Sequence, residues 1–258
     1  MFSEEAKLNK QQSTHPKMPS PKVLIALTSY NDIFYDDGAK TGVFLVEALH
    51  PFNEYKAKGY KVQFVSETGK FGWDDHSLTE TFLKGQDKKD YENQSSDFQI
   101  ALKQIKKASD VNPDDYKIFF AAAGHGSCFD FPTATGLQDL ALKIYVNGGV
   151  IAAVCHGPVI FAGLKDKKTG ENIAKGKSLT GFTDEGEEIM GVDKIMKQKG
   201  VPTVCEIFKE CGIKYMAPLG PWDDFSLTDG KFVTGVNPAS AGSVSYTHLR
   251  AHETLANL

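Results

Sequence analysis

The sequence predicts one α/β domain organised on a mostly parallel β-sheet. Three uninterrupted apolar runs, 22–28, 116–123 and 150–154, have the length of strands that are covered on both faces, as central strands of parallel sheets are. The run at 150–154 ends abruptly in Cys155-His156-Gly157-Pro158, where the Gly-Pro pair favours the first turn of a helix. A length of 258 residues is ordinary for a single domain of this class with insertions.

The first half of the chain supplies two strands and a long insertion. The strand at 22–28 is followed by a turn-rich loop and by a short apolar helix at 42–51. A second strand is expected at 61–67. The segment 77–111 is charged, with weak helical periodicity, and we expect it to cover one edge of the sheet.

Glu47 is the single acid within the helix expected at 42–51. Apolar residues flank it on both sides, so the helix is apolar nearly all round and is expected to bury the carboxyl group. A buried carboxyl group tends to stay protonated. The alternative is an exposed acid on the one wet stripe of the helix, and the pattern does not decide between the two.

The third strand, at 116–123, leads directly into Gly124-His125-Gly126. Glycines in such a loop allow backbone amides to approach a ligand closely, which makes the loop a candidate oxyanion hole. The plainer interpretation is a tight strand-to-helix turn. A Gly-His-Gly triplet does not separate these interpretations.

The second half alternates helices, strands and polar insertions. A helix at 137–145 ends at Asn147-Gly148-Gly149, ahead of the strand at 150–154. The remaining expected elements are a polar insertion at 165–177, a strand at 178–183, helices at 192–200 and 204–211, a Pro-rich aromatic loop at 215–224 and a hairpin at 223–234.

Cys155 lies at the predicted sharp turn between the fourth strand and the next helix. A nucleophile in such a turn needs small neighbours two residues away on each side, and Ala153 and Gly157 meet that need. Near a helix N-terminus the macrodipole and free amides favour thiolate over thiol, so we expect a reactive cysteine. The alternative is an inert cysteine in the core, the commonest state of a free cysteine.

A cluster of acids follows the strand at 178–183. Asp184, Glu185, Glu187 and Glu188 come at its carboxyl end, where open α/β sheets build their sites. Acids at the start of a helix also complement the helix dipole, so any single one of them is a weak catalytic candidate.

Composition limits the possible partners. With 41% hydrophobic and 24% charged residues and a net charge of -4, the chain offers no electrostatic basis for binding nucleic acid or an acidic membrane, and we expect a small-molecule partner. No apolar run is long enough to span a bilayer. The four cysteines show no zinc-like pairing with histidine, so reduced thiols and a cytoplasmic location are expected. The polar segment 1–21 does not have the pattern of a signal peptide.

Several motifs occur together in a fixed order. They are Leu27-Thr-Ser-Tyr-Asn31, Ala121-Ala-Ala-Gly-His-Gly126, Ala152-Ala-Val-Cys-His-Gly-Pro158, Gly181-Phe-Thr-Asp-Glu-Gly-Glu187 and Gly235-Val-Asn-Pro-Ala-Ser240. This combination resembles the ThiJ/PfpI superfamily and, within it, the fungal heat-shock-protein-31-like branch, the glutathione-independent glyoxalase III proteins. The resemblance extends over about 21–241. Outside it we expect a polar, disordered lead-in at 1–20 and an atypical tail at 242–258 that is not native to the fold.

The resemblance implies a flavodoxin-like three-layer α/β sandwich, usually a homodimer. It implies an enzyme that converts methylglyoxal to D-lactate through a cysteine hemithioacetal, a D-lactate dehydratase of the lyase class, with neither metal nor nicotinamide required. By position, Cys155 matches the nucleophile, His156 and Glu187 match its triad partners, and Glu47 matches the helix glutamate. Gly124 and the amide of His156 match oxyanion-binding positions, and His125 is placed with Gly124 in substrate binding.

Two other classes of function use the same fold. The family includes stress-inducible holdase chaperones, which bind unfolded clients on an exposed apolar surface and do not need the thiol. It also includes protein deglycases and hydrolases of the cysteine-peptidase type, which would use the same cysteine. Substrate identity is not determined by the residues.

Overall fold

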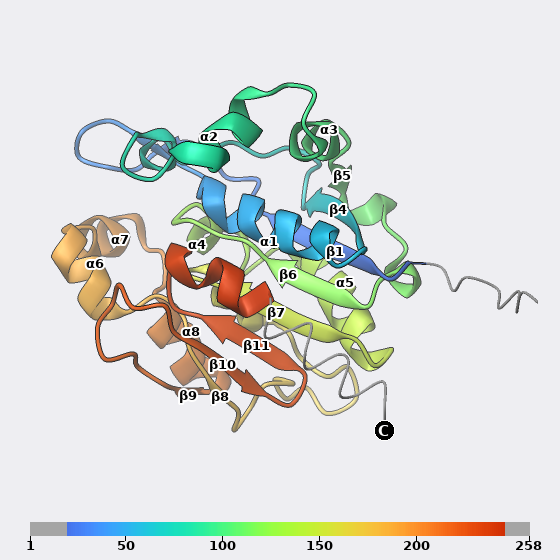
Figure 1. Ribbon diagram of the computed structural model, residues 1–258. Helices are drawn as coiled ribbons and strands as arrows, with labels where there is room; N and C mark the ends of the chain where they lie inside the picture. The colour runs from blue at the N-terminus through green and yellow to red at the C-terminus, as the bar shows by residue number, and fades with distance from the viewer. Residues whose placement is uncertain (1–19, 246–258) are drawn as a thin grey trace, which may run out of the picture.

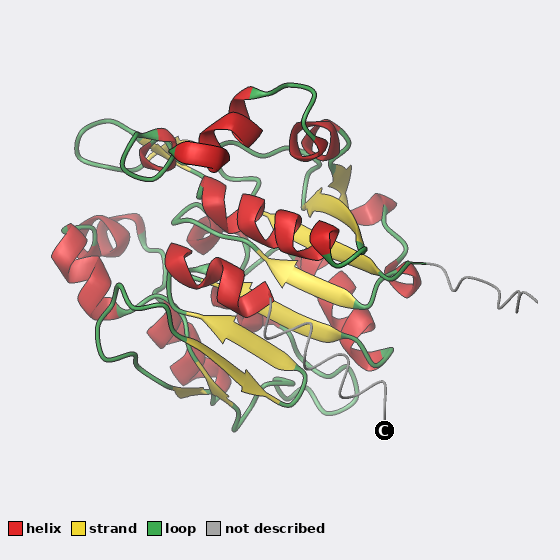
Figure 2. Cartoon of the chain, viewed as in Figure 1, coloured by secondary structure: helices red, strands yellow, loops and turns green. Residues whose placement is uncertain are grey.

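The structure is a computed structural model that describes residues 20–245. The expected lead-in at 1–20 therefore lies outside the described residues except for Ser20, and so does the expected tail from 246 onward. Between these limits the chain folds around one mixed sheet (Figures 1 and 2).

The central sheet of the described chain has seven strands in the order β10-β11-β7-β6-β1-β4-β5. Neighbouring strands are parallel except for β10 and β11, which pair antiparallel as the predicted hairpin. The order β4-β1-β6-β7-β11 is the flavodoxin-like one, and it confirms the predicted fold class. The bounds are β1 Lys22–Leu27, β4 Lys61–Ser66, β5 Lys106–Lys107, β6 Ile118–Ala121, β7 Val150–Val154, β10 Ser226–Asp229 and β11 Phe232–Gly235.

Helices cover both faces of this sheet, which completes the three layers. In Figure 1, α1 lies in front of the sheet and α5 and α8 lie behind it. The helices are α1 Leu45–Ala57, α2 Gly85–Glu92, α3 Asp97–Lys103, α4 Ser127–Asp130, α5 Thr135–Val146, α6 Asp184–Met190, α7 Asp193–Lys199 and α8 Val204–Cys211. Short 3₁₀ helices are η1 His76–Leu78, η2 Ala108–Asp110, η3 Pro113–Asp115, η4 Gly157–Gly163 and η5 Pro238–Ser240.

Two expected elements differ from what the structure has. The helix expected at 42–51 begins later, at Leu45, and continues past Pro51 to Ala57. Proline removes one backbone hydrogen bond, but Phe52 and Tyr55 are buried beyond it, and this packing holds the helix together. The strand expected at 178–183 is reduced to β8 Ser178–Leu179, which pairs with β9 Lys214–Tyr215 outside the main sheet.

The insertion at 77–111 covers an edge of the sheet, as expected. Its strand β5 pairs with β4 at that edge, and α3 packs against β4. A second small sheet, β2 Asp32–Ile33 with β3 Lys40–Thr41, lies in the loop that follows β1. Both segments lie toward the carboxyl ends of the parallel strands, where this class of fold builds its sites.

The packed structure continues four residues beyond the expected boundary at 241. Residues 241–245 are helical, and Val244 is fully buried against the core. No helix within residues 20–245 combines the length and apolar character needed to cross a membrane.

Candidate active site

Cys155 is held in a strained backbone conformation at the end of β7. Its φ angle of 57° makes it the one non-glycine residue in the left-handed region among the described residues. The chain is held there from both sides, because Cys155 N donates to Gly235 O at 3.0 Å and Phe182 N donates to Cys155 O at 2.8 Å. Strain of this kind costs about 1 to 3 kcal/mol and is typical of functional turns.

The small neighbours expected around the turn have a clear steric reason. A Cβ atom on Gly157 would lie 2.4 Å from Ala121 O on the adjacent strand β6. Gly124, which follows β6, has a φ angle of 145°, and a Cβ atom there would lie 2.4 Å from Gly42 O. Glycine at 157 lets the cysteine turn pack against β6, and glycine at 124 lets the Gly-His-Gly loop pack against the backbone of 42–44.

His156 and Glu187 lie beside the thiol in the order that a catalytic triad needs. The Cys155 Sγ atom is 3.2 Å from His156 Nδ1, and His156 Nε2 is 2.8 Å from Glu187 Oε1. Thr183 caps α6 by accepting from Gly186 N, and this turn directs Glu187 inward. Of the four clustered acids, Glu187 alone is buried, and the other three are exposed.

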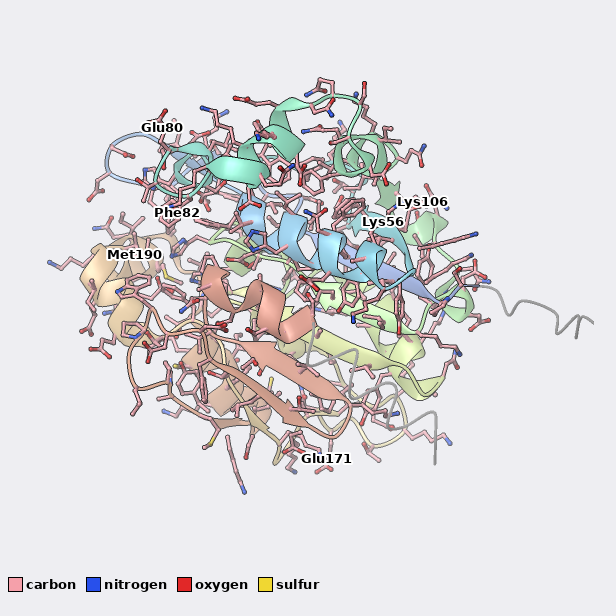
Figure 3. The ribbon with its side chains drawn as sticks, viewed as in Figure 1. Lys56, Glu80, Phe82, Lys106, Glu171 and Met190 are labelled. Atoms are coloured by element: carbon pink, nitrogen blue, oxygen red, sulfur yellow. The ribbon has the colours of Figure 1, made fainter. Side chains whose placement is uncertain are left out.

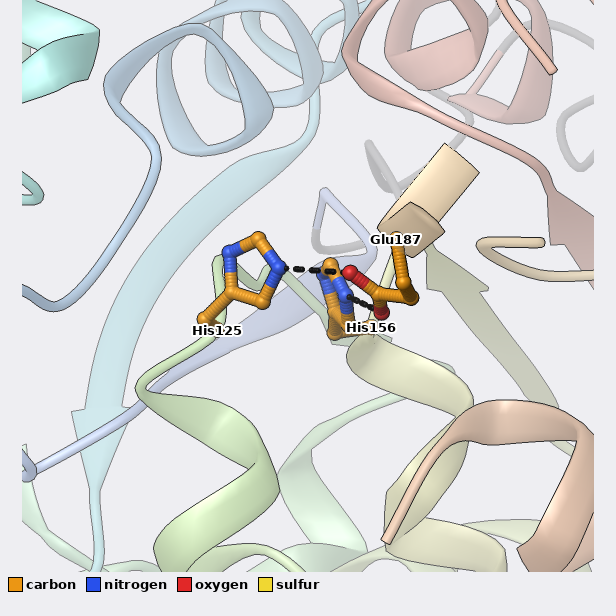
Figure 4. A group of neighbouring side chains, drawn as sticks. All are labelled: His125, His156 and Glu187. Carbon is orange, nitrogen blue, oxygen red and sulfur yellow. Dashed lines mark hydrogen bonds and ion pairs between the residues drawn. The ribbon is translucent and has the colours of Figure 1, made fainter. Parts of the chain in front are cut away.

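Glu187 has a second imidazole partner. His125 Nε2 is 2.9 Å from Glu187 Oε2, so the carboxylate bridges the two histidines (Figure 4). Burial alone would raise the pKa of Glu187, but His156 and His125 hold it well below its usual range. Glu187 is therefore an anion at neutral pH.

The other ring nitrogen of His125 is engaged as well. His125 Nδ1 is 3.2 Å from Tyr35 Oη, and the Tyr35 hydroxyl donates to Asp74 Oδ2 at 2.7 Å. Because neither ring nitrogen is free, the ring is better placed to support Glu187 than to bind substrate. Sequence reasoning missed Tyr35 and Asp74, since they come from separate loops and no motif marks them.

Glu47 is buried below the thiol, as one of the two sequence interpretations had it. Its side chain is fully buried, and Oε2 accepts from Ala123 N at 3.1 Å. Burial raises the pKa of Glu47 to about 8, against the lowering by the nearby Cys155 thiol and the Ala123 amide. Oε1 has no nitrogen or oxygen partner among the described residues, so a protonated Glu47 has the sulfur as its neighbour to hydrogen-bond.

The expectation that a helix N-terminus would make Cys155 a thiolate is wrong for the resting site. Burial raises the pKa of the thiol well above its usual range, and Glu47 and Glu187 raise it further. The segment after Cys155 is the 3₁₀ helix η4, and its influence does not outweigh desolvation and two carboxyl groups. The resting group is therefore a thiol that must lose its proton during reaction.

A cleft of about 810 Å³ leads from solvent to Cys155, His125 and His156. Its wall is mostly apolar, and its exposed large apolar side chains are Phe82, Met190 and Trp222. Figure 3 shows Phe82 and Met190 on the same flank of the molecule. A second groove, of about 850 Å³, lies over α6, α7 and α8, and its lining includes Glu187 but not the cysteine.

His125, His156 and Glu187 also form a group whose donor atoms lie within 4.8 Å of one another. A metal ion would fit this donor set only by displacing the hydrogen bonds that the three side chains make to each other.

A flavodoxin-like sheet that brings a buried cysteine in a strained turn together with a histidine and two glutamates defines the class of α/β protein to which this chain corresponds. The model of the DJ-1/PfpI family matches residues 39–241, and the chain belongs to this family.

Close relatives are fungal. The chain is 62% identical to the glutathione-independent glyoxalase of Saccharomyces cerevisiae over 240 residues, 93% of this chain and 100% of that protein. It is 56% identical to glyoxalase 3 of Candida albicans over 232 residues, 90% of this chain and 98% of that protein. The crystal structure of glyoxalase III from Candida albicans matches with a TM-score of 0.88 and 55% identity, over 90% of this chain and 97% of that one.

Proposed function

We propose that this protein is a glutathione-independent glyoxalase that converts methylglyoxal to D-lactate through a hemithioacetal on Cys155. The observation that carries the proposal is a strained cysteine with a histidine on one side and a protonated carboxyl group on the other. The names of the fungal relatives support the same activity. Neither glutathione nor a redox cofactor is needed, because the substrate is oxidised at one carbon and reduced at the next.

The first step forms a bond between sulfur and the aldehyde carbon. His156 Nδ1, 3.2 Å from the sulfur, accepts the thiol proton as the carbonyl π bond opens. Glu47, protonated at rest, donates its proton to the aldehyde oxygen. The amides of Gly124 and His156 stabilise the negative charge that develops on oxygen.

The second step moves hydrogen between the two carbons. The Glu47 carboxylate removes the proton from the hemithioacetal carbon, which gives an enediolate, and returns it to the neighbouring carbon. The hydroxyl proton on the first carbon shifts to the second oxygen, and a thioester remains. Water then cleaves the thioester: Glu47 regains its proton from the attacking water, and His156 returns its proton to the sulfur. The second proton of the water leaves with the product acid, which ionises to lactate in solvent.

The test supplies methylglyoxal without glutathione and measures D-lactate with a stereospecific assay. Wild-type protein is expected to produce D-lactate, and Cys155→Ala is expected to lose at least about 10³-fold in rate, because removing a nucleophile removes the covalent path. Cys211→Ala is the matched control, since that thiol is half-buried in α8 and contacts the Phe161 carbonyl. Equal rates for Cys155→Ala and wild type would refute the proposal.

A second candidate function, binding of unfolded clients, is favoured by the exposed Phe82, Met190 and Trp222 in the wall of the cleft. This activity would not need the thiol. If Cys155→Ala suppresses aggregation as well as the wild type does, client binding is supported. If Cys155→Ala no longer suppresses aggregation, both activities depend on the active site. A deglycase would also use Cys155 and is tested by the same variant.

The proposal includes a cytoplasmic location and assembly as a homodimer. All four cysteines are free thiols, which is consistent with a reducing compartment such as the cytoplasm. The homodimer implied by the resemblance stays a prediction, and sedimentation at micromolar concentration would test it.

A further inference from the structure

The bridging carboxylate of Glu187 determines where two protons lie. An ionised carboxylate accepts hydrogen bonds and donates none. Glu187 Oε1 therefore accepts from a protonated Nε2 of His156 at 2.8 Å, and Oε2 accepts from a protonated Nε2 of His125 at 2.9 Å. With Nε2 protonated, a neutral His156 presents an unprotonated Nδ1 to the sulfur of Cys155.

The contact at the other ring nitrogen of His125, Nδ1, determines the position of a third proton. A phenol hydroxyl carries one proton, and that of Tyr35 is donated to Asp74 Oδ2 at 2.7 Å. The contact of 3.2 Å between Tyr35 Oη and His125 Nδ1 then requires Nδ1 to be the donor. Both ring nitrogens of His125 carry protons in this arrangement, so the ring is an imidazolium.

The surroundings of His125 suit a cation. The ring is buried between two carboxylates, Glu187 in direct contact and Asp74 through Tyr35, so that negative, positive and negative charges alternate. Phe34 stacks on the ring with centroids 5.1 Å apart, and an aromatic face attracts a cation. The titratable groups that face His125 and its partners are Tyr35, Glu47, Asp74, His76, Cys128, Cys155, His156 and Glu187.

We propose that His125 is a positioning residue, held as an imidazolium between Glu187 and the Tyr35 and Asp74 pair. It fixes the Glu187 carboxylate against His156 Nε2 and keeps His156 neutral, ready to accept the thiol proton of Cys155. Three residues outside the catalytic triad, namely Tyr35, Asp74 and His125, thus set the protonation state of its base.

The electrostatics of His156 are consistent with this role. Burial lowers the pKa of His156, and the neighbouring His125, with ring centroids 4.1 Å apart, lowers it further, while Glu187 opposes both. If the charge on His125 is removed, burial and Glu187 are left as the main influences on the pKa of His156. The pKa of His156 must then rise, and its base form is lost at a higher pH.

The direct test is ¹⁵N NMR of histidine-labelled protein in a Cys155→Ala background, where the thiol does not couple to the titration of His156. Both ring nitrogens of His125 are expected to have protonated-type shifts at pH 7. His125→Gln keeps an N–H donor for Glu187 without the charge, and the His156 titration is expected to move to higher pH. Tyr35→Phe breaks the link to Asp74, and a smaller shift in the same direction is expected.

The kinetic test uses the intact cysteine and rests on the proposed glyoxalase activity. In His125→Gln the ratio of kcat/KM at pH 6 to that at pH 8 is expected to fall about tenfold, because the base is protonated over more of the range. Tyr116→Phe is the control for the tyrosine variant, since Tyr116 precedes β6 at the opposite end of the sheet.

The outcomes separate this proposal from the proposed activity. An unprotonated Nδ1 on His125 at pH 7, or a His156 titration unmoved in both variants, would overturn the positioning role. Loss of activity by the same factor at every pH would assign His125 a structural role instead. If His125→Gln does not fold, Tyr35→Phe decides the outcome. The NMR results need no substrate, so they stand even where D-lactate is not formed.

Discussion

The two glutamates of the site are equally buried, yet they titrate in opposite directions. Glu47 is 0% exposed and Glu187 is 2% exposed, and each lies in the first turn of its helix, α1 or α6. Burial raises the pKa of Glu47 to about 8. Burial would also raise that of Glu187, but His156 and His125 lower it well below its usual range.

The difference shows that partners, rather than burial, assign the chemical role. Glu47 has one backbone N–H and a thiol as neighbours, so it is neutral and can donate a proton. Glu187 has two imidazoles, so it is an anion that holds them in place. Two titratable groups whose environments separate their pKa values are the usual basis for dividing acid and base work in an active site.

The largest effect is expected from Glu187→Gln. An amide has one acceptor oxygen, so it can accept from only one of the two histidines, and the other loses its hydrogen-bond acceptor. D-lactate formation is expected to fall about 10⁴-fold, as when the orienting acid of a triad becomes an amide. Stability is expected to fall by about 3 kcal/mol, because the charge on His125 loses its counter-ion. Denaturant unfolding beside turnover checks both, and Glu188→Gln on the exposed side of α6 is the control.

Glu47→Gln is expected to reduce turnover by about 10²-fold or more while Cys155 keeps its reactivity toward an alkylating reagent. Glutamine retains a hydrogen-bond donor for the sulfur but cannot exchange protons with the substrate. Turnover and alkylation are measured side by side, with Glu54→Gln on the same helix as the control. Full turnover in Glu47→Gln would exclude the acid/base role and leave Glu47 as a positioning group.

Glu47→Gln also tests whether the pKa of Glu47 is raised, through the pH dependence of the free energy of unfolding. The pKa of Glu47 is raised in the folded state, from 4.5 to about 8, so its contribution is fully present below pH 4.5 and is lost as pH rises through 8. Wild-type protein should therefore lose roughly 3 to 5 kcal/mol relative to Glu47→Gln between these limits. Glu187 is present in both proteins, so its own contribution to stability, which is lost as pH falls below 4.5, cancels in the difference. Urea unfolding of both proteins at pH 5, 7 and 9 measures the difference, and a constant difference would contradict a raised pKa.

The smallest effect concerns how the two helices begin. Thr183 caps α6 through its hydroxyl, which accepts from Gly186 N at 2.8 Å, whereas α1 has no side-chain cap at Phe44. Thr183→Ala is expected to cost about 1 kcal/mol of stability and only a few-fold in turnover. Thermal unfolding and D-lactate assays check this. A loss of turnover as large as in Glu187→Gln would mean that the cap, rather than the histidines, positions Glu187.

Much of the fold follows from local pattern. The apolar runs at 22–28, 116–123 and 150–154 correspond to β1, β6 and β7, because a strand covered on both faces needs a continuous apolar run. The end of α1 was misplaced, since local propensity treats Pro51 as a stop, while the helix continues because Phe52 and Tyr55 pack into the core. The pattern also overestimated β8, which lies outside the main sheet.

In the candidate site, too, some features were predictable from the local sequence pattern and others were not. The turn at Cys155 and its glycine neighbour were predictable, because a nucleophile in a sharp turn demands small residues at fixed spacing. Which of the four clustered acids turns inward was not predictable from the pattern, and the resemblance to a family singled out Glu187. Tyr35 and Asp74 had no signal, since a loop tyrosine and a loop aspartate occur in most proteins.

By itself the sequence determined the order of strands and helices along the chain and the sharp turn that holds Cys155, because periodicity and steric demand act between residues that are close along the chain. Only the tertiary structure decided the protonation states. The carboxyl of Glu47 meets one amide, while that of Glu187 meets imidazoles 31 and 62 residues away in the chain. Desolvation and charge interactions depend on distance in space, so the chemistry of the site is settled when β6, β7 and α6 come together.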